Sequence, residues 1–336
     1  MALGEFELID RFFRAAGVSR ADVVLGIGDD GALLRPPTGH DLVAVSDTLV
    51  ESVHFPAGAS PESIGHRALA VNLSDIAAMG ATPAWALLSL TLPAAEESWL
   101  AAFARGFGEL ARRHSVALVG GDTTRGPLTL GVQVLGWVPT NRGLRRSGAQ
   151  PGDLLCVSGT PGDAAAGLAL CQAGPPAGAN ARLQEADAAL RARFEFPTPR
   201  LALGQRLLER ASACIDVSDG LVGDVAKLVT SSGCSARIDE ARIPRSPALA
   251  ALVAAGRFTE DEAVRFALQG GDDYELVFAL PPAQLAALGG VADDCSFTMI
   301  GELTACSAAS ASSVSVQRAD GTIRTPPSGF EHFQRT

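Results

Sequence analysis

The sequence predicts a two-domain α+β protein, with an N-terminal mixed sheet covered by helices on one face and a C-terminal α/β domain. Three observations predict this class. The chain has 336 residues, which is more than one ordinary hydrophobic core holds. Strand and helix patterns alternate along both halves. A turn-rich segment at residues 148–153 separates the halves, so we expect domains at residues 1–149 and 150–336.

The N-terminal half shows the spacing expected of helices interleaved with four or five strands. Ser60 and Pro61 are a favourable helix start and Gly80 is a favourable end, which predicts a helix over residues 61–79. One face of the resulting sheet would be covered by helices. The other expected elements are helices at residues 5–16 and 96–113, and strands at residues 23–25, 42–45, 84–92, 116–119 and 128–138.

The C-terminal half begins with a strand and an alanine-rich helix. Gly162 and Asp163 open that helix, and a loop follows at residues 174–180. Near the end of the chain, Asp320 and Gly321 lie between two short strand patterns and predict a hairpin. The expected elements are helices at residues 162–173, 200–211 and 221–231, and strands at residues 154–158, 214–217, 274–280, 314–317 and 322–324.

Charge and composition narrow the range of functions. Twenty-seven basic against thirty-seven acidic residues give a net charge of −10, which argues against nucleic-acid binding. Lys227 is the only lysine and follows no glycine-rich turn, which excludes a Walker-type phosphate loop. The cysteines form no C-x-x-C pair, the acidic N-terminus lacks a signal-peptide pattern, and no apolar run approaches the roughly 20 residues of a membrane span. We therefore expect a soluble cytoplasmic protein that binds neither nucleic acid nor membrane.

Six short motifs place aspartate among glycine, serine and threonine, an arrangement typical of tight turns where backbone and ligand approach closely. Three of them hold two acids, and such pairs repel each other unless a cation or a basic group compensates. Because the motifs contain no basic residue, bound Mg²⁺ is the simpler explanation for the set, although each motif alone is more often an ordinary turn. The motifs are Gly28-Asp29-Asp30, Ser46-Asp47-Thr48, Asn72-Leu73-Ser74-Asp75, Gly121-Asp122-Thr123, Asp216-Val217-Ser218-Asp219 and Gly271-Asp272-Asp273.

Carboxylates with Mg²⁺ point to phosphate chemistry, in which the metal neutralises charge while the protein positions donor and acceptor. A nucleotide also needs a cationic contact. Arg146 is the favoured candidate, with Arg142 and Arg145 nearby, and the alternative is a solvated basic loop. His54 follows the second aspartate motif and has either a structural or a binding role. A two-metal phosphatase also gathers carboxylates and stays an open alternative.

The chain resembles the thiamine-monophosphate kinase family in motifs that run in order from the N-terminus to about residue 280. Any one of these motifs alone would be weak, whereas the ordered set is highly specific. The matching segments are GIGDD at residues 26–30, DTLV at 47–50, HF at 54–55, AVNLSDIAAMGA at 70–81, GGDTTRGP at 120–127, RSGA at 146–149, DVSDGL at 216–221 and GGDDYEL at 270–276.

The resemblance implies a fold shared with aminoimidazole ribonucleotide synthetase and a homodimer paired through the N-terminal domain. It also implies ATP-dependent phosphorylation of thiamine monophosphate to thiamine diphosphate by direct in-line transfer, with several Mg²⁺ ions as cofactor and ATP as co-substrate. Carried over residue by residue, Asp30, Ser46, Asp47, Asp75, Asp122, Asp216 and Asp219 would hold metal; Gly121, Asp122, Arg146 and Ser218 would bind ATP; and His54, Asp272 and Phe330 would bind the acceptor.

Three positions depart from the family pattern. Val45 stands where relatives often carry a hydroxyl ligand, Asp272 is one methylene shorter than the usual glutamate, and Phe330 stacks but cannot donate a hydrogen bond. Two other ATP-using members of the superfamily fit less well. Selenophosphate synthetase has a reactive N-terminal cysteine or selenocysteine together with a lysine, and this pair has no counterpart here. The hydrogenase-maturation relative ends in a cysteine, whereas this sequence ends without one. A non-catalytic nucleotide-binding scaffold is a further alternative, although the central aspartates are all present.

Overall fold

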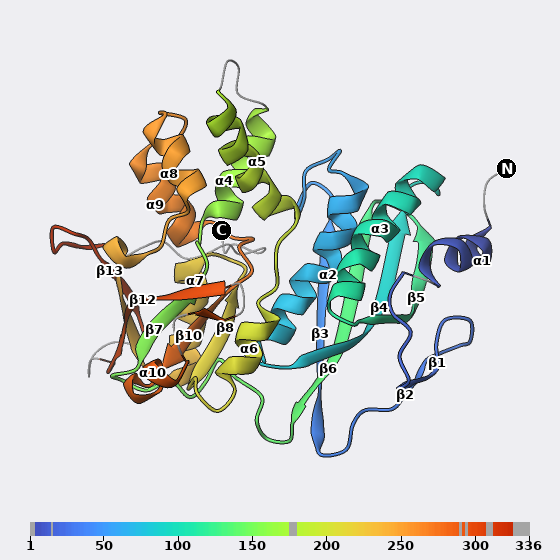
Figure 1. Ribbon diagram of the computed structural model, residues 1–336, viewed down its shortest axis with the longest axis horizontal. Helices are drawn as coiled ribbons and strands as arrows, with labels where there is room; N and C mark the ends of the chain where they lie inside the picture. The colour runs from blue at the N-terminus through green and yellow to red at the C-terminus, as the bar shows by residue number, and fades with distance from the viewer. Residues whose placement is uncertain are drawn as a thin grey trace, which may run out of the picture. The chain divides into compact units, whose positions relative to one another are not determined.

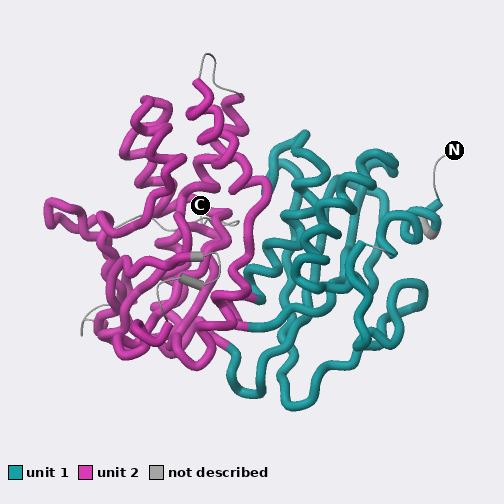
Figure 2. The backbone as a smooth tube through the Cα atoms, viewed as in Figure 1, with its two compact units in different colours: residues 1–76, 81–143 teal, residues 77–80, 144–336 magenta. Residues whose placement is uncertain are grey.

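The computed structural model describes residues 4–14, 16–174, 180–288, 291–292, 295–306 and 312–324. The chain divides into two compact units, shown in two colours in Figure 2. The division falls between Gly143 and Leu144, a few residues before the expected boundary at residue 149. Residues 77–80, at the end of a helix of the first unit, group with the second unit. None of the helices in these described segments is both long and apolar enough to cross a membrane.

The first unit is built on a four-stranded mixed sheet, as the sequence predicts (Figure 1). Its strands lie in the order β3-β6-β4-β5, with β4 and β5 parallel and the other neighbours antiparallel. The helices α2 and α3 lie on the same side of this sheet. The elements are β3 (His40–Val50), α2 (Pro61–Ala78), β4 (Thr82–Leu92), α3 (Glu97–Arg113), β5 (Ala117–Arg125) and β6 (Thr129–Pro139).

Burial of the sheet alternates with the pleat. On β3, Val43 and Leu49 are buried, whereas Leu42, Ala44 and Thr48 are exposed on the other face. The buried face packs against apolar side chains of α2 and α3, which are among the most buried of the chain. These helix residues are Leu69, Leu73, Ile76, Leu100, Phe103, Phe107 and Leu110.

The N-terminal helix is shorter than expected. The sequence predicts one helix over residues 5–16, but α1 (Glu5–Leu8) passes directly into a π-helical turn, η1 (Ile9–Phe13). This turn buries Phe13, whose ring lies edge-on to that of Phe103 at 6.2 Å. A wider turn re-aims the side chains that follow it, so periodicity alone does not find it. A small hairpin of β1 (Val23–Leu25) and β2 (Leu33–Leu34) follows.

The second unit is built on a largely antiparallel sheet in the order β14-β13-β9-β12-β7-β10-β8, with β11 pairing to β12. Only the pair of β9 and β13 is parallel among the described strands of this sheet. The elements that the sequence predicts are β7 (Leu154–Ser158), α4 (Asp163–Ala173), α6 (Leu201–Leu207), β8 (Ala213–Val217), α7 (Leu221–Ser232), β10 (Glu275–Leu280), and the hairpin of β13 (Val314–Gln317) and β14 (Ile323–Arg324).

Several elements of the second unit have no counterpart in the sequence predictions. Their polar and apolar residues alternate less regularly, so the elements that pack against them decide which face is buried. They are α5 (Ala181–Glu195), β9 (Ser235–Asp239), η2 (Glu240–Arg242), α8 (Pro247–Ala254), α9 (Glu260–Gln269), η3 (Pro282–Gln284), α10 (Leu285–Leu288), β11 (Val291–Ala292) and β12 (Cys295–Thr304).

Candidate active site

Two of the aspartate motifs lie inside strands of the first unit, not in turns. Ser46 and Asp47 are in the middle of β3, and Gly121 and Asp122 are in β5. The turn interpretation is therefore wrong for these motifs. In β5 the glycine permits close strand contact, because a Cβ at Gly121 would lie 1.8 Å from the carbonyl oxygen of Leu88, and its φ is +150°. The small residues of this motif therefore accommodate the neighbouring strand.

Asp47 is fixed to α2 through a buried amide. The Asp47 backbone N–H donates to Oδ1 of Asn72 at 3.1 Å, and Nδ2 of Asn72 donates to the Ala68 carbonyl oxygen at 3.1 Å. Asn72 is fully buried, so it ties the strand to the helix. Asp75 lies one helical turn further along α2, on nearly the same face as Asn72. The structure thus places two predicted metal ligands on adjoining elements.

Asp47 and Asp122 lie on strands at opposite edges of the same sheet. Asp122 pairs with Ser89 of β4, which is level with Gly131 of β6 and with Thr48, the residue after Asp47. The two edge strands are three inter-strand spacings apart, which places about 14 Å between their backbones. One ion does not reach both carboxylates within this sheet. If both bind metal, they bind different ions, in agreement with the several ions implied by the resemblance.

Asp30 lies in the exposed loop between β1 and β2. The Asp29 carboxylate accepts the backbone N–H of Asp30 at 2.8 Å, as in a tight turn. Nη1 of Arg14 donates to the carbonyl oxygen of Ile27 in the same loop at 2.9 Å. The Arg14 guanidinium therefore lies next to this motif in the structure, although Arg14 is not part of the motif in the sequence.

His54 closes the turn that follows β3. Its Nδ1 accepts the backbone N–H of Val50 at 3.0 Å, and its own backbone N–H donates to the Val50 carbonyl oxygen at 2.9 Å. An accepting Nδ1 places the proton of the neutral ring on Nε2. The structural role expected as one alternative for His54 is therefore present.

In the second unit, a buried aspartate shapes the motif at the end of β8. Asp216 is buried in the strand, and Ser218 and Asp219 follow it just before α7. The Asp224 carboxylate, on the first turn of α7, accepts the backbone N–H groups of Ser218 at 3.0 Å and of Asp219 at 2.9 Å. Asp224 thus fixes the backbone that carries two of the predicted ligands.

Lys227 compensates these acids. Its ammonium group forms ion pairs with Asp219 and, at 2.8 Å, with Asp224. Burial raises the pKa of Asp224, and attraction to Lys227 opposes that rise. For Lys227, burial lowers the pKa, but Asp224 and Asp219 together outweigh it, so the pKa is raised. The expectation that no basic residue compensates the motif is wrong here, and the i,i+3 spacing of Asp224 and Lys227 was the signal that could have shown it.

The Gly-Gly-Asp-Asp-Tyr-Glu-Leu segment forms a turn docked on the same motif. The backbone N–H of Asp272 donates to the Ser218 carbonyl oxygen, and that of Tyr274 to the Val217 carbonyl oxygen, both at 2.9 Å. Both donors have positive φ, +69° for Asp272 and +51° for Tyr274. The hydroxyl of Tyr274 donates to Oδ1 of Asp272 at 3.1 Å. The structure therefore brings the predicted acceptor ligand Asp272 beside the predicted ATP ligand Ser218.

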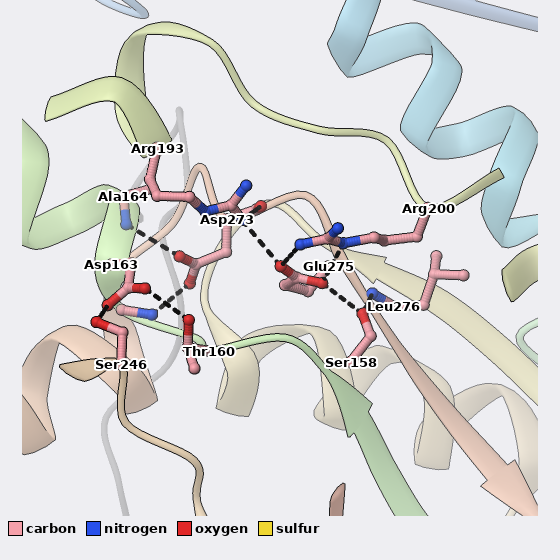
Figure 3. A network of polar contacts seen from close by, with 11 residues as sticks. Ser158, Thr160, Asp163, Ala164, Arg193, Arg200, Ser246, Asp273, Glu275 and Leu276 are labelled. Carbon is pink, nitrogen blue, oxygen red and sulfur yellow. Dashed lines mark hydrogen bonds and ion pairs between the residues drawn. The ribbon is translucent and has the colours of Figure 1, made fainter. Parts of the chain in front are cut away.

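Below this turn, Glu275 is the centre of a buried ionic network (Figure 3). Arg200 donates from Nε to Oε2 of Glu275 at 2.7 Å and from Nη2 to Oε1 at 2.5 Å, a bidentate pair. Arg193 donates to Oε1 of Glu275 at 2.8 Å and to the carbonyl oxygen of Asp273 at 3.2 Å. Burial raises the pKa of Glu275, but Arg200 and Arg193, with the hydrogen bond from Ser158, together outweigh burial and the pKa is lowered.

Two smaller residues complete the surroundings of Glu275. Ser158 Oγ donates to Oε2 of Glu275 at 2.5 Å and accepts the backbone N–H of Leu276 at 2.9 Å. Gly159 leaves room for the carboxylate, because a Cβ there would lie 2.2 Å from Oε1. With both oxygens paired, Glu275 stays ionised in a site without water contact.

Asp273 is compensated differently, mainly by backbone N–H groups. Its carboxylate accepts the N–H groups of Gly162 at 2.7 Å and Ala164 at 3.2 Å, at the start of α4. Burial nevertheless raises its pKa well above the usual value. Asp163 beside it bonds to Thr160 at 2.5 Å and to Ser246 at 2.7 Å, as Figure 3 shows. Asp273 therefore has a structural role, and the residues around it support the turn that carries Asp272.

The predicted ATP ligand Arg146 lies away from the motif at the end of β8. The carbonyl oxygen of Arg146 accepts a bond from Ser232, the last residue of α7, whereas Ser218 lies before the first turn of that helix. A helix of this length spans about 18 Å, so the two residues are at opposite ends of α7. Phe330 lies outside the described residues.

The donor set suits a hard divalent cation. Among the described residues, no three His, Cys, Asp or Glu side chains gather tightly enough to hold a metal by themselves. The candidate ligands instead stand singly or in pairs, and their donor atoms are carboxylate and hydroxyl oxygens. This pattern fits Mg²⁺, which takes one or two carboxylates and completes its shell with water and substrate phosphates.

The chain is similar to proteins of known activity along nearly its whole length. Residues 28–138 match the N-terminal domain of AIR synthase related proteins, and residues 150–311 match the C-terminal domain. The thiamine-monophosphate kinase of Escherichia coli K12 is 47% identical over 311 residues, covering 91% of this chain and 92% of the relative.

Two solved structures are also similar. The thiamine-monophosphate kinase of Stenotrophomonas maltophilia is 47% identical, with a TM-score of 0.82 over 94% of this chain and 97% of the other. The structure of AaThiL complexed with AMPPCP and TMP is 31% identical, with a TM-score of 0.76 over 99% of both chains. The fold, the order of the motifs and these similarities agree, and this chain belongs to the thiamine-monophosphate kinase family.

Proposed function

We propose that this protein transfers the γ-phosphoryl group of ATP to thiamine monophosphate, giving ADP and thiamine diphosphate. Identity of 47% to a thiamine-monophosphate kinase over 91% of the chain carries the proposal. The second unit supports it, because Asp272 and Ser218 are held side by side, where an acceptor and a nucleotide would have to meet. Transfer is direct and in line, with no phosphorylated residue on the enzyme.

We further propose that Mg²⁺ is the resident metal, and that it neutralises phosphate charge when bound. The protein's part is to hold and orient the reactants. His54 and Asp272 orient the acceptor, with Phe330 stacking on it, and Gly121, Asp122, Arg146 and Ser218 bind ATP. The proposed metal ligands are Asp30, Ser46, Asp47, Asp75, Asp122, Asp216 and Asp219.

A product assay tests this function. Purified protein is incubated with ATP, Mg²⁺ and thiamine monophosphate, and thiamine diphosphate and ADP are separated by chromatography. We expect both products in equal amounts, and neither when EDTA replaces Mg²⁺. ATP hydrolysis at the same rate with and without thiamine monophosphate would reject the kinase in favour of a two-metal phosphatase.

We also propose that the protein is a homodimer paired through the open face of the first unit's sheet. Helices cover one face, whereas the other presents apolar side chains, with Leu42 53% exposed. Trp137, level with Leu42, and Leu135, level with Ala44, are half-buried and pack against Trp85, so they border the exposed part of this face. A surface of this kind is typical of protein interfaces. The cytoplasmic location expected from the sequence stays a prediction.

Light scattering coupled to gel filtration tests the dimer. The unchanged protein should have twice the mass of the chain. Leu42→Glu places a charge at the centre of the proposed interface and should give the monomer mass at the same concentration. A monomer mass for the unchanged protein at about 50 μM, a concentration at which weak dimers still form, would reject the proposal.

A further inference from the structure

Lys227 lies between two acidic side chains of the second unit. It is the only lysine of the chain, and its half-exposed side chain lies between Asp219 and Asp224. Asp224 and Lys227 are three residues apart on α7, so they lie on one face of the helix. Among the described residues, Lys227 forms the one ion pair of Asp219.

The two carboxylates differ in how much they need this ammonium group. Asp224 is fully buried and already accepts two backbone N–H groups, so an unpaired charge there would be costly. Asp219 is about one-third exposed, and water can solvate it. The link to Asp224 is therefore the permanent one, and the link to Asp219 is the one that can be exchanged.

We propose that Lys227 is a positioning residue that serves as the built-in counter-ion of Asp219. It holds the Asp219 carboxylate while no metal is bound, and gives it up when a divalent cation binds that carboxylate. Lys227 then stays paired with Asp224, so the loop backbone of Ser218 and Asp219 keeps its anchor. This inference rests on the proposed role of Asp219 as a Mg²⁺ ligand.

The exchange follows from charge and geometry. An ammonium group and Mg²⁺ are attracted to the same carboxylate oxygen, and a divalent ion interacts about twice as strongly at equal distance. Without Lys227, Asp219 and Asp224 would repel each other in the metal-free protein. With Lys227 present, the metal-free loop keeps its conformation, and little free energy is needed to release Asp219 from the ammonium group. Lys227 thus acts on the metal through Asp219 and touches no reacting atom.

The single lysine gives this inference a direct probe. Protein grown with lysine labelled by ¹³C at Cε gives one lysine side-chain NMR signal, which reports on Lys227 alone. We expect the signal to move when Mg²⁺ and the non-hydrolysable nucleotide AMPPCP are added together. In Asp219→Asn the signal of the free protein should already lie near this second position and should not move further.

Two results of the NMR experiment would overturn the proposal. A signal that stays in place with Mg²⁺ and AMPPCP would show that Lys227 keeps Asp219. A signal that moves equally with AMPPCP in EDTA would show that Lys227 responds to phosphate and not to metal. The product assay is run on the same sample. If the enzyme turns over but its lysine signal does not move, the proposed function stands and only this inference is rejected.

Thermal unfolding separates this role from a merely structural one. Lys227→Met should lower the Tm in EDTA by about 3 °C or more, and Mg²⁺ with AMPPCP should restore more of the Tm than it adds to the unchanged protein. Arg237→Met, which removes an exposed ion pair with Glu302, is the matched control and should show no such metal dependence. An equal fall in Tm with and without Mg²⁺ and AMPPCP would reject the counter-ion role, and rescue by Lys227→Arg would support it.

Discussion

The tripeptide Gly-Asp-Asp occurs once in each unit, and the two copies have opposite environments. At residues 28–30 both acids are exposed in a hairpin loop. At residues 271–273, Asp273 is fully buried and accepts two backbone N–H groups, while Asp272 bonds to Tyr274. The same tripeptide therefore forms a solvated acidic loop in the first unit and a turn held by hydrogen bonds in the second.

The acids of the two units are compensated in different ways. Asp30 and Asp122 in the first unit form no ion pair with any described basic residue, and water solvates them. In the second unit, Lys227 pairs with Asp219, and two arginines pair with Glu275. Burial decides the difference, because a carboxylate out of water must be paired or bonded, whereas an exposed one is free to meet a cation.

The largest expected effect tests whether the buried network supports the second unit. Arg200→Met removes the bidentate partner of Glu275 and leaves a buried charge with one remaining arginine. We expect a loss of about 3–5 kcal/mol in the free energy of unfolding. Chemical denaturation followed by circular dichroism measures it, with the exposed-pair variant Arg237→Met expected to lose less than about 1 kcal/mol. A loss below that of the control would show that the network is not stabilising.

The next effect tests whether the exposed acids of the first unit are kept for function. Asp122→Asn should lower kcat by about 100-fold or more, since it removes a proposed ligand of the metal and ATP. The Tm should stay unchanged, because Asp122 is exposed and its removal leaves no buried group unpaired. Glu109→Gln, an exposed change on α3, is the control for activity. Full turnover by Asp122→Asn would assign Asp122 to strand structure alone.

Acid should weaken the two units over different pH ranges. In the first unit, burial, with Arg113 and His66, lowers the pKa of His114 from 6.5 to about 4. The unfolded chain therefore binds more protons between these values, and stability is lost as pH falls from 6.5 towards 4, by about 2 kcal/mol after allowance for partial solvation. In the second unit, the lowered pKa of Glu275 gives stability that is lost only as pH falls below about 4.5.

Denaturation of His114→Gln at pH values from 7 to 4 measures the first of these effects. The variant should show a flatter pH dependence than the unchanged protein above pH 4.5. An equally steep fall in the variant would show that other groups carry the acid sensitivity.

The smallest effect concerns the turn at residues 271–274. Tyr274→Phe removes the hydroxyl that donates to Asp272, a bond worth about 1 kcal/mol. We expect the KM for thiamine monophosphate to rise about fivefold, with kcat and the KM for ATP nearly unchanged. Asp272→Asn, assayed beside it, should affect the same constant. A change in the KM for ATP instead would place Asp272 on the nucleotide side of the site.

The sequence predicted elements best where patterns are strong and local. The helix expected at residues 61–79 is α2 at Pro61–Ala78, and the hairpin around Asp320 and Gly321 is present. The helix at residues 5–16 was overextended, because a π-helical turn interrupts it. The helix α5 was missed, because its polar and apolar residues show little helical periodicity of their own and its burial depends on α4 and α8.

The candidate site shows the same limit. Aspartate motifs in sequence order identified the chemistry and the family, because spacing and residue type are properties of the chain itself. Whether a motif is a turn or a strand depended on its partners, as Gly121 against Leu88 shows. Sequence reasoning likewise missed Asp224, Tyr274, Arg193 and Arg200, which act on the site only through contacts made in the folded unit.

By itself, the sequence determined the α+β class, the oxygen-rich donor set and the family, since these follow from composition, periodicity and the order of motifs. Beyond the local spacing of Asp224 and Lys227, the tertiary structure alone decided which acids are compensated. Lys227 reaches Asp219, which precedes α7, and Arg200 reaches Glu275 from 75 residues away in the chain. Burial and distance fix the state of a carboxylate, and neither is written in the residues beside it.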